Sequence, residues 1–340
     1  MQRTKRKNSS MLSKLVLPLI LAAAAYLALI IYGRFDDLWE ALRSFNLAYL
    51  VPVLALVLAN YGLRFARWHY YLSHAGVDVP ARESLAVFFS GFAMSITPAR
   101  VGELLKCVML RDEAGVRMSL SVPVVLADRI NDVVAVSALV AVGMVRFSFA
   151  RGATIIALVV IAALVVVLGF SPWIAEGALR LFKRRFAGES ASPAEAVREA
   201  AGVFALLLRG RALLFGTALG VLAWFAECAA LYLVLGGFGD WTLTLYAATF
   251  IYALSTLGGA LSLLPGGLGV TEIGMTALLV AFGVARETSV AAVVVVRLCT
   301  LWFAAGLGVV VYLLHRRRVA RLNAEHGKVA SSLEVSPADR

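Results

Sequence analysis

Long apolar runs separated by short polar stretches dominate the chain. Each of six runs is long enough for a helix that crosses a bilayer, which takes about 20 residues. These runs lie at about 15–33, 47–63, 119–145, 153–174, 211–236 and 288–314. None of them alternates apolar and polar residues as the strands of a membrane barrel do. The pattern predicts an all-α polytopic membrane protein with a single transmembrane domain over 15–314.

Two further apolar regions are interrupted by proline and glycine. The first consists of 84–97 and 101–110, and the second of 244–264 and 270–284. Proline lacks an N–H group and clashes with the preceding turn, so each region is predicted to form two helices that meet at a corner. Treating both as re-entrant pairs leaves six spans. Eight full spans, with the second pair crossing twice, satisfy the pattern equally.

The two corners repeat each other without a gap. GFAMSITPARVG, from Gly91, aligns with GGALSLLPGGLG, from Gly258. Each corner is followed by a glutamate and, 26 or 25 residues later, by an arginine inside an apolar run: Glu103 and Arg129, then Glu272 and Arg297. We therefore expect repeat 1 at about 47–145 and repeat 2 at about 211–314, inverted in the six-span scheme. Repeats with broken helices at matching positions indicate a transporter site.

The charge of the chain supports a membrane protein and not a nucleic-acid-binding one. Only 16% of residues are charged, against about 25% in soluble domains. The formal net charge is +11, but the basic residues gather beside the apolar runs, as the positive-inside rule requires. This predicts a multi-pass protein of the cytoplasmic membrane. The basic N-terminus (1–14) and a basic, disordered tail (315–340) are then both cytoplasmic.

Charged residues also lie inside the predicted spans, where each costs roughly 2.5–3.5 kcal/mol on insertion scales. Asp128, Arg129 and Asp132 can share one broad helix face. They form either a self-neutralising cluster that joins helices or a site for a lipid headgroup or an ion. Arg297 and Glu227 are similarly deep. Arg297 needs an anion, and Glu227 is either an ion-pair partner, a neutral acid or the carrier of a coupling proton.

The corners themselves are candidate anion sites. A helix that starts after each corner points free N–H groups and its positive dipole end into the break. Glu103 and Glu272 either cap these helices or line a cavity. We read Arg64 and Arg67, which form one stripe with Asn60 near the inner end of the second span, as ordinary interface anchors. The alternative is a mouth that gathers lipid headgroups. The residues expected to bind substrate are Arg100, Glu103, Asp128, Arg129, Asp132, Glu227, Pro265, Gly266, Gly267, Gly269, Glu272 and Arg297.

We predict no cofactor and no metal site. The three cysteines are isolated in apolar surroundings, where they read as small buried hydrophobes. No phosphate-binding loop of the G-x-x-x-x-G-K-[ST] type occurs, so coupling to ATP within this chain is not expected. Asp128 and Asp132 could hold Mg²⁺ against a lipid diphosphate, although Arg129 competes for both carboxylates.

The motifs PARVGE (98–103), DRIND (128–132) and LPGGLGVTE (264–272), in this order, resemble the lysylphosphatidylglycerol synthase transmembrane region. Many members have Glu where this chain has Asp128. The resemblance implies translocation of a lipid, either an aminoacylated phospholipid or a polyprenyl-linked one. Full-length synthases also carry a cytosolic domain that transfers lysine. Only 26 residues follow the last predicted span, so we do not expect that activity here.

The leading hypothesis is a lipid flippase or lipid-binding transporter with a charged intramembrane cavity. Its partners would be membrane lipids, namely anionic or aminoacylated phospholipids or polyprenyl-phosphate-linked lipids. One alternative is an intramembrane lipid-phosphate transferase. Another is a non-catalytic accessory subunit of a lipid-modifying or glycosylation enzyme.

Overall fold

The fold is seen in a computed structural model. It describes four stretches of the chain: 35–95, 103–144, 193–262 and 264–334. The spans expected at 15–33 and 153–174 lie outside these stretches. Every regular element in the described residues is a helix. Those long and apolar enough to cross a membrane are Leu47–His74, Gly210–Gly237 and Arg286–Arg321. The predicted all-α polytopic membrane fold is confirmed.

The described chain falls into two halves with the same order of helices. The first half holds α2 (Phe35–Ser44), η1 (Leu47–Tyr49), α3 (Leu50–His74), α4 (Ala81–Phe92), α5 (Leu105–Ala114) and α6 (Met118–Met144). The second holds α9 (Pro193–Leu207), α10 (Gly210–Gly237), α11 (Leu245–Leu261), η4 (Pro265–Gly267), α12 (Val270–Ala281), α13 (Arg286–Arg297), the π-helical turn η5 (Leu298–Trp302) and α14 (Phe303–Glu334). Each half contains a long helix, a broken pair and a further long helix.

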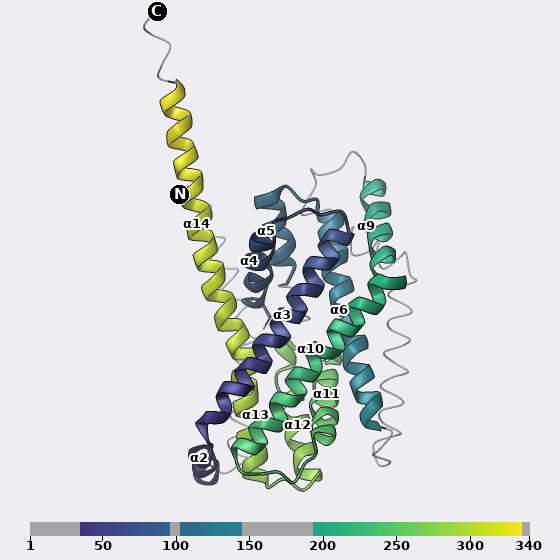
Figure 1. The fold of residues 1–340 in the computed structure, drawn as a ribbon, viewed down its shortest axis with the longest axis vertical. Coiled ribbons are helices and arrows are strands. Elements are labelled where there is room, and N and C mark those ends of the chain that lie inside the picture. Colours follow the sequence, from purple (N-terminus) through teal and green to yellow (C-terminus); the bar gives the residue numbers. More distant parts are fainter. Residues whose placement is uncertain (1–34, 96–102, 145–192, 263, 335–340) are drawn as a thin grey trace, which may run out of the picture.

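The two broken pairs occupy opposite ends of the molecule. Figure 1 shows α4 and α5 in the upper half and α11 and α12 in the lower half, with α3 and α10 crossing between them. α4 and α5 have 12 and 10 residues, and α11 and α12 have 17 and 12. All four are shorter than the roughly 20 residues that cross a bilayer. Entry of the two pairs from opposite sides of the membrane, and the inverted repeat, stay predictions.

The crossing of α3 and α10 depends on glycine. A Cβ at Gly216 would lie 1.8 Å from the Tyr71 hydroxyl oxygen, and a Cβ at Gly220 would lie 2.7 Å from Arg67 Nη1. Asn60 Nδ2 donates a hydrogen bond to the backbone oxygen of Ala223 at 2.8 Å. Small residues allow membrane helices to approach closely, and here they let polar side chains of α3 fit against α10.

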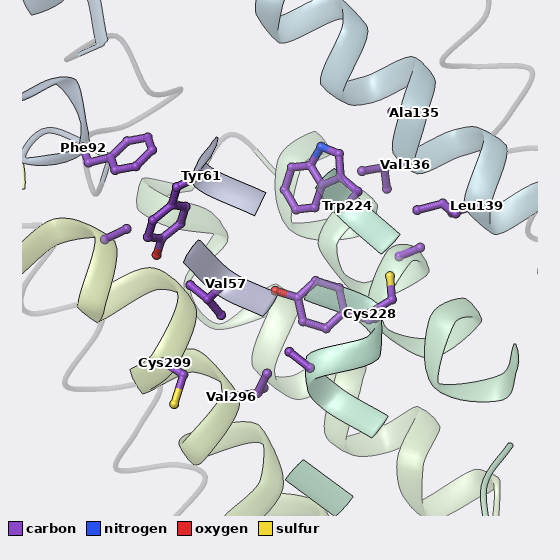
Figure 2. Packing of buried hydrophobic residues seen from close by; sticks show 14 of the residues in the cluster. Val57, Tyr61, Phe92, Ala135, Val136, Leu139, Trp224, Cys228, Val296 and Cys299 are labelled. Carbon is purple, nitrogen blue, oxygen red and sulfur yellow. The ribbon is translucent and has the colours of Figure 1, made fainter. Parts of the chain in front are cut away.

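An apolar core joins the two halves. Figure 2 shows buried side chains of α3, α6, α10, α13 and η5 packed together, among them Val57, Val136, Cys228 and Val296. All three cysteines are buried and free, as expected of small hydrophobes. This core surrounds the polar groups described below, so their charges are held within an apolar body.

α14 reaches further than the apolar pattern indicated. It packs against α4 in the upper half and continues to Glu334, into the tail that we expected to be disordered. His315 Nε2 lies 2.6 Å from Glu113 Oε2 and ties this helix to the end of α5. The apolar run ends near residue 314, but helix formation needs only backbone hydrogen bonds and suitable side chains.

Candidate functional site

Seven charged side chains from α3, α6, α5 and the turn before α5 meet inside the upper half of the molecule, and we call them the charged cluster. They are Arg64, Arg67, Glu103, Lys106, Asp128, Arg129 and Asp132. Those from α3 are one helical turn apart, and those from α6 fall within two turns, so each helix presents its charges on one face. Glu103 and Lys106 belong to the turn and helix that follow the first corner.

Arg67 is the centre of the charged cluster and is 0% exposed. Its Nε donates to Asp128 Oδ1 at 2.7 Å, and its Nη2 donates to Asp132 Oδ1 at 2.5 Å. Arg64 Nη2 donates to Asp132 Oδ2 at 3.2 Å. Trp224 Nε1, from α10, also donates to Asp132 Oδ1 at 3.1 Å. The two aspartates are therefore bound by α3 as well as by their own helix.

Arg129 forms the edge of the charged cluster, because 22% of its side chain is exposed. Its Nη2 donates to Asp128 Oδ2 at 2.7 Å, and its Nη1 lies 2.9 Å from Asp132 Oδ2. The same Nη1 lies 3.3 Å from Glu103 Oε1. Arg129 thus connects α6 to the corner residue that begins the α5 segment.

Lys106 is a buried ammonium with an unusual set of neighbours. Its Nζ lies 3.3 Å from Glu103 Oε2, and 4.5 Å and 5.3 Å from the ring centres of Trp68 and Phe88. Aromatic faces attract cations electrostatically. A Cβ at Gly91 would lie 2.8 Å from Lys106 Cγ, so this glycine in α4 makes room for the lysine side chain.

The second corner holds a smaller and more closed ionic pair. Arg297 Nε donates to Glu272 Oε1 at 2.6 Å, and its Nη2 donates to the backbone oxygen of Gly266 at 3.0 Å. Glu272 Oε2 accepts from the backbone N–H of Gly269 at 2.7 Å, which caps α12. Glu272 is 0% exposed. The corner, the helix after it and α13 are thereby joined.

The ionic pairs repeat together with the corners. In each half, the glutamate that follows the corner pairs with the arginine of the next long helix: Glu103 with Arg129, and Glu272 with Arg297. The flanking residues differ, because the other charges of the first half have no charged counterparts in the second. The first half therefore carries a charged cluster, and the second carries a single pair.

The backbone of the second corner requires glycine. Pro265 starts η4, and Gly266, Gly267 and Gly269 have φ of 61°, 68° and 86°. Gly269 combines its φ with a ψ of −61°, a conformation that residues with a Cβ rarely adopt.

We therefore expect Gly269→Ala to lower the free energy of unfolding by about 1–3 kcal/mol through backbone strain. Gly274→Ala is the matched control in the same helix, since the atom nearest to its Cβ would be 3.8 Å away. Thermal unfolding of both variants in detergent tests this. Equal melting temperatures for the two would contradict the assigned strain.

Glu227 lies apart from both corners along α10. Its Oε2 accepts a hydrogen bond from the Tyr252 hydroxyl at 2.6 Å. Nearby, the Tyr61 hydroxyl donates to the backbone oxygen of Thr300 at 2.8 Å, within the π-helical turn η5. Such turns leave backbone oxygens available to side chains and often occur at functional sites.

The structure brings together three of the expected site residues from α6 with Glu103, and separately Glu272 with Arg297 and the glycine corner. Arg100 lies in 96–102, outside the described residues. The sequence alone did not indicate that Arg64, Arg67 and Lys106 belong to the charged cluster. The interpretation of the two arginines as interface anchors is wrong, since they are 7% and 0% exposed. Their spacing on one face of α3 was the available signal.

The carboxylates are engaged by basic groups and not arranged for a metal. Asp128 and Asp132 each receive arginine nitrogens at both oxygens. Within the described stretches, no group of three or more His, Cys, Asp and Glu side chains is arranged to hold a metal ion. A magnesium ion would have to displace arginine from both aspartates.

Comparison with known proteins identifies the family of the chain. The family model of the lysylphosphatidylglycerol synthase TM region matches residues 15–332. A UPF0104 membrane protein of Methanothermobacter thermautotrophicus is 26% identical over 314 residues, which cover 85% of this chain and 91% of that protein. A UPF0104 membrane protein of Pyrococcus horikoshii is 24% identical over 332 residues, covering 89% and 98%. Because the family model spans nearly the whole chain, this protein belongs to the lysylphosphatidylglycerol synthase transmembrane-region family.

Proposed function

We propose that this protein binds the headgroup of a membrane lipid at the charged cluster and moves that lipid across the bilayer. The lipid is a phospholipid, aminoacylated or not, or a polyprenyl-linked lipid. The observation that carries the proposal is the cluster itself, seven charges inside an apolar helical body. Charged groups are costly in a membrane interior and mark substrate pathways there. The family supports a membrane role related to lipids.

The position of the charged cluster suits a transported headgroup. α4 ends and α5 begins beside the cluster, so both ends of the first corner approach it. Arg64 lies 5.9 Å from the ring centre of Phe92, the last residue of α4, and Glu103 precedes α5. Irregular backbone within a membrane is tolerated where it lines a cavity or is buried in protein. In this proposal, the end of α4, Glu103 and Arg129 form the entrance to the site.

The second corner has a different part in the proposal. Arg297 and Glu272 form an ion pair, and each also bonds the backbone of the second corner. This ion pair, which we call the clasp, holds α12 and α13 together. Opening on this side would require the clasp to loosen. Glu227, whose Oε2 accepts a hydrogen bond from the Tyr252 hydroxyl, is proposed as the group that exchanges a coupling proton.

The charges at the two ends of the described chain support an orientation in the membrane. At the end of the molecule where α2 lies, acidic residues outnumber basic ones: Asp36, Asp37, Glu40, Asp240 and Glu287 against Arg43 and Arg286. At the opposite end, basic residues outnumber acidic ones. We propose that this basic end, with the first corner, faces the cytoplasm in the cytoplasmic membrane and that both termini are cytoplasmic.

A transport assay tests the proposed function. Proteoliposomes carry headgroup-labelled phospholipid, and the label in the outer leaflet is removed chemically at timed intervals. The wild-type protein should make all the label accessible. Arg129→Gln should slow this at least about tenfold, which corresponds to roughly 1.4 kcal/mol in binding or barrier.

The matched control is Arg209→Gln, because Arg209 is an exposed arginine at the start of α10, at the same end of the molecule. It removes the same charge and should leave the rate unchanged. Wild-type liposomes no faster than empty ones would reject transport by the protein alone. Equal rates for wild type and Arg129→Gln would reject the charged cluster as the route.

A further inference from the structure

We infer that the charged cluster selects lipids whose headgroup is a phosphate anion without an amino group, such as phosphatidylglycerol or a polyprenyl phosphate. This inference rests on the proposed function and narrows its substrate class. It comes from comparing the hydrogen-bond donors of the cluster that are open to a ligand with the acceptors that are open to it.

The acceptor side of the charged cluster is already occupied. Each of the six carboxylate oxygens of Glu103, Asp128 and Asp132 lies within 3.3 Å of a lysine or arginine nitrogen. An ammonium group on a ligand would have to displace one of these cations. It would also approach the remaining arginines, which repel it.

The donor side is not fully used. Arg64 Nε, Arg67 Nη1 and Arg129 Nε are buried atoms that have no hydrogen-bond partner among the described residues, although Arg67 Nη1 packs against Gly220 of α10. The first two side chains are more than nine-tenths buried, where an unused donor is costly. A guanidinium presents its N–H groups in a planar fork that matches phosphate oxygens. A phosphate beside Arg129 would accept hydrogen bonds from donors for which the described protein supplies no acceptor.

The place where an amine would bind is filled by the protein itself. An ammonium is held best by a carboxylate together with aromatic faces. That combination exists here as Glu103 with Trp68 and Phe88, and the Lys106 ammonium occupies it. Gly91 allows the lysine stem to reach it. The resident lysine therefore stands where the amine of an aminoacylated or ethanolamine headgroup would otherwise sit.

Lipid binding to the full-length protein, purified in detergent, tests the inference. Native mass spectrometry is used with phosphatidylglycerol, a polyprenyl phosphate, phosphatidylethanolamine and lysyl-phosphatidylglycerol, one at a time and in pairs. The first two should bind at least about tenfold more tightly than the two that carry amines. Equal binding of all four, or preference for an amine-bearing lipid, would overturn the inference.

A soluble anion separates a lipid site from a general phosphate site. Glycerol phosphate, added to the phosphatidylglycerol complex at equal concentration, should leave the bound lipid in place, because the acyl chains contribute to binding. Displacement at that concentration would assign the charged cluster to a soluble anion and would overturn the lipid part of the proposal.

Two variants test the assignment of the residues. Lys106→Met keeps an unbranched apolar chain but frees Glu103 and the aromatic faces, so binding of phosphatidylethanolamine relative to phosphatidylglycerol should rise about tenfold. Arg129→Gln, which is partly exposed and so less demanding for folding, should weaken phosphatidylglycerol binding, and Arg209→Gln should not. An unchanged lipid preference in Lys106→Met, or unchanged phosphatidylglycerol binding in Arg129→Gln, would refute the assignment.

The outcomes for binding and transport are separable. Selective binding of the anionic lipids without any transport would reject the proposed function and leave this inference standing. Transport with preference for aminoacylated lipids would reject the inference and leave the proposed function standing.

Discussion

Replacing Arg67 with methionine is expected to lower the free energy of unfolding by about 3–5 kcal/mol, because it leaves buried carboxylates without their main cation. Arg67 is fully buried and donates to both Asp128 and Asp132. Arg64 and Arg129 would remain near these carboxylates, but neither reaches the Oδ1 atoms that Arg67 occupies. We expect the variant to accumulate poorly in membranes and to unfold at a markedly lower temperature.

The loss should depend on charge and not only on packing. Adding Asp128→Asn to Arg67→Met removes one of the orphaned carboxylates, so the double variant should recover part of the lost stability. Melting temperatures of both variants, in one detergent and at one lipid content, give the comparison. Arg209→Gln is the surface control. A double variant less stable than Arg67→Met would contradict the charge-balance explanation.

Gly308→Ala is expected to destabilise the contact between α4 and α14 by about 1–3 kcal/mol through overpacking. An added Cβ would lie 2.3 Å from the backbone nitrogen of Ala93 and 2.7 Å from the carbonyl carbon of Phe92. Backbone atoms cannot rotate away as side chains can. α4 would therefore have to move, and with it the end that leads into the first corner.

Gly306→Ala is an ideal control for this substitution. Gly306 lies in the same helix, and no atom lies within 4 Å of the position of its Cβ. Alanine at that position should be neutral or slightly stabilising, since glycine costs up to about 1 kcal/mol within a helix. Thermal unfolding distinguishes the two variants. If Gly306→Ala lowered stability as much as Gly308→Ala, the close approach of α14 to α4 would be wrong.

The second corner could be predicted from the sequence because its signal is local. Proline and glycine act on the backbone around them, and the second corner indeed has three glycines at positive φ. The repeat places an arginine 26 or 25 residues after each corner glutamate, but the sequence did not predict that the two side chains pair. For Arg297, the partner Glu272 was among several acids considered, and the structure selects it.

The charged cluster could not be predicted in full, because its members come from helices far apart in the chain. Arg67 lies 61 residues from Asp128. A stripe of basic residues at the end of an apolar run has the same pattern whether it faces lipid headgroups or another helix. Only the crossing of α3 over α10 and α6 buried Arg64 and Arg67. Lys106 likewise is a buried cation because α4 packs against α5.

The sequence by itself determined the class of this protein and the second corner, and it predicted the repeat. Those properties depend on apolar length and on backbone chemistry, which act over a few residues. The tertiary structure alone decided which charges meet, because burial turns a distant cation and anion into a strong pair. It brought seven residues, which the sequence had interpreted in different ways, into one charged cluster. That cluster lies in the first half of the described chain, and the second half has the single Glu272–Arg297 pair.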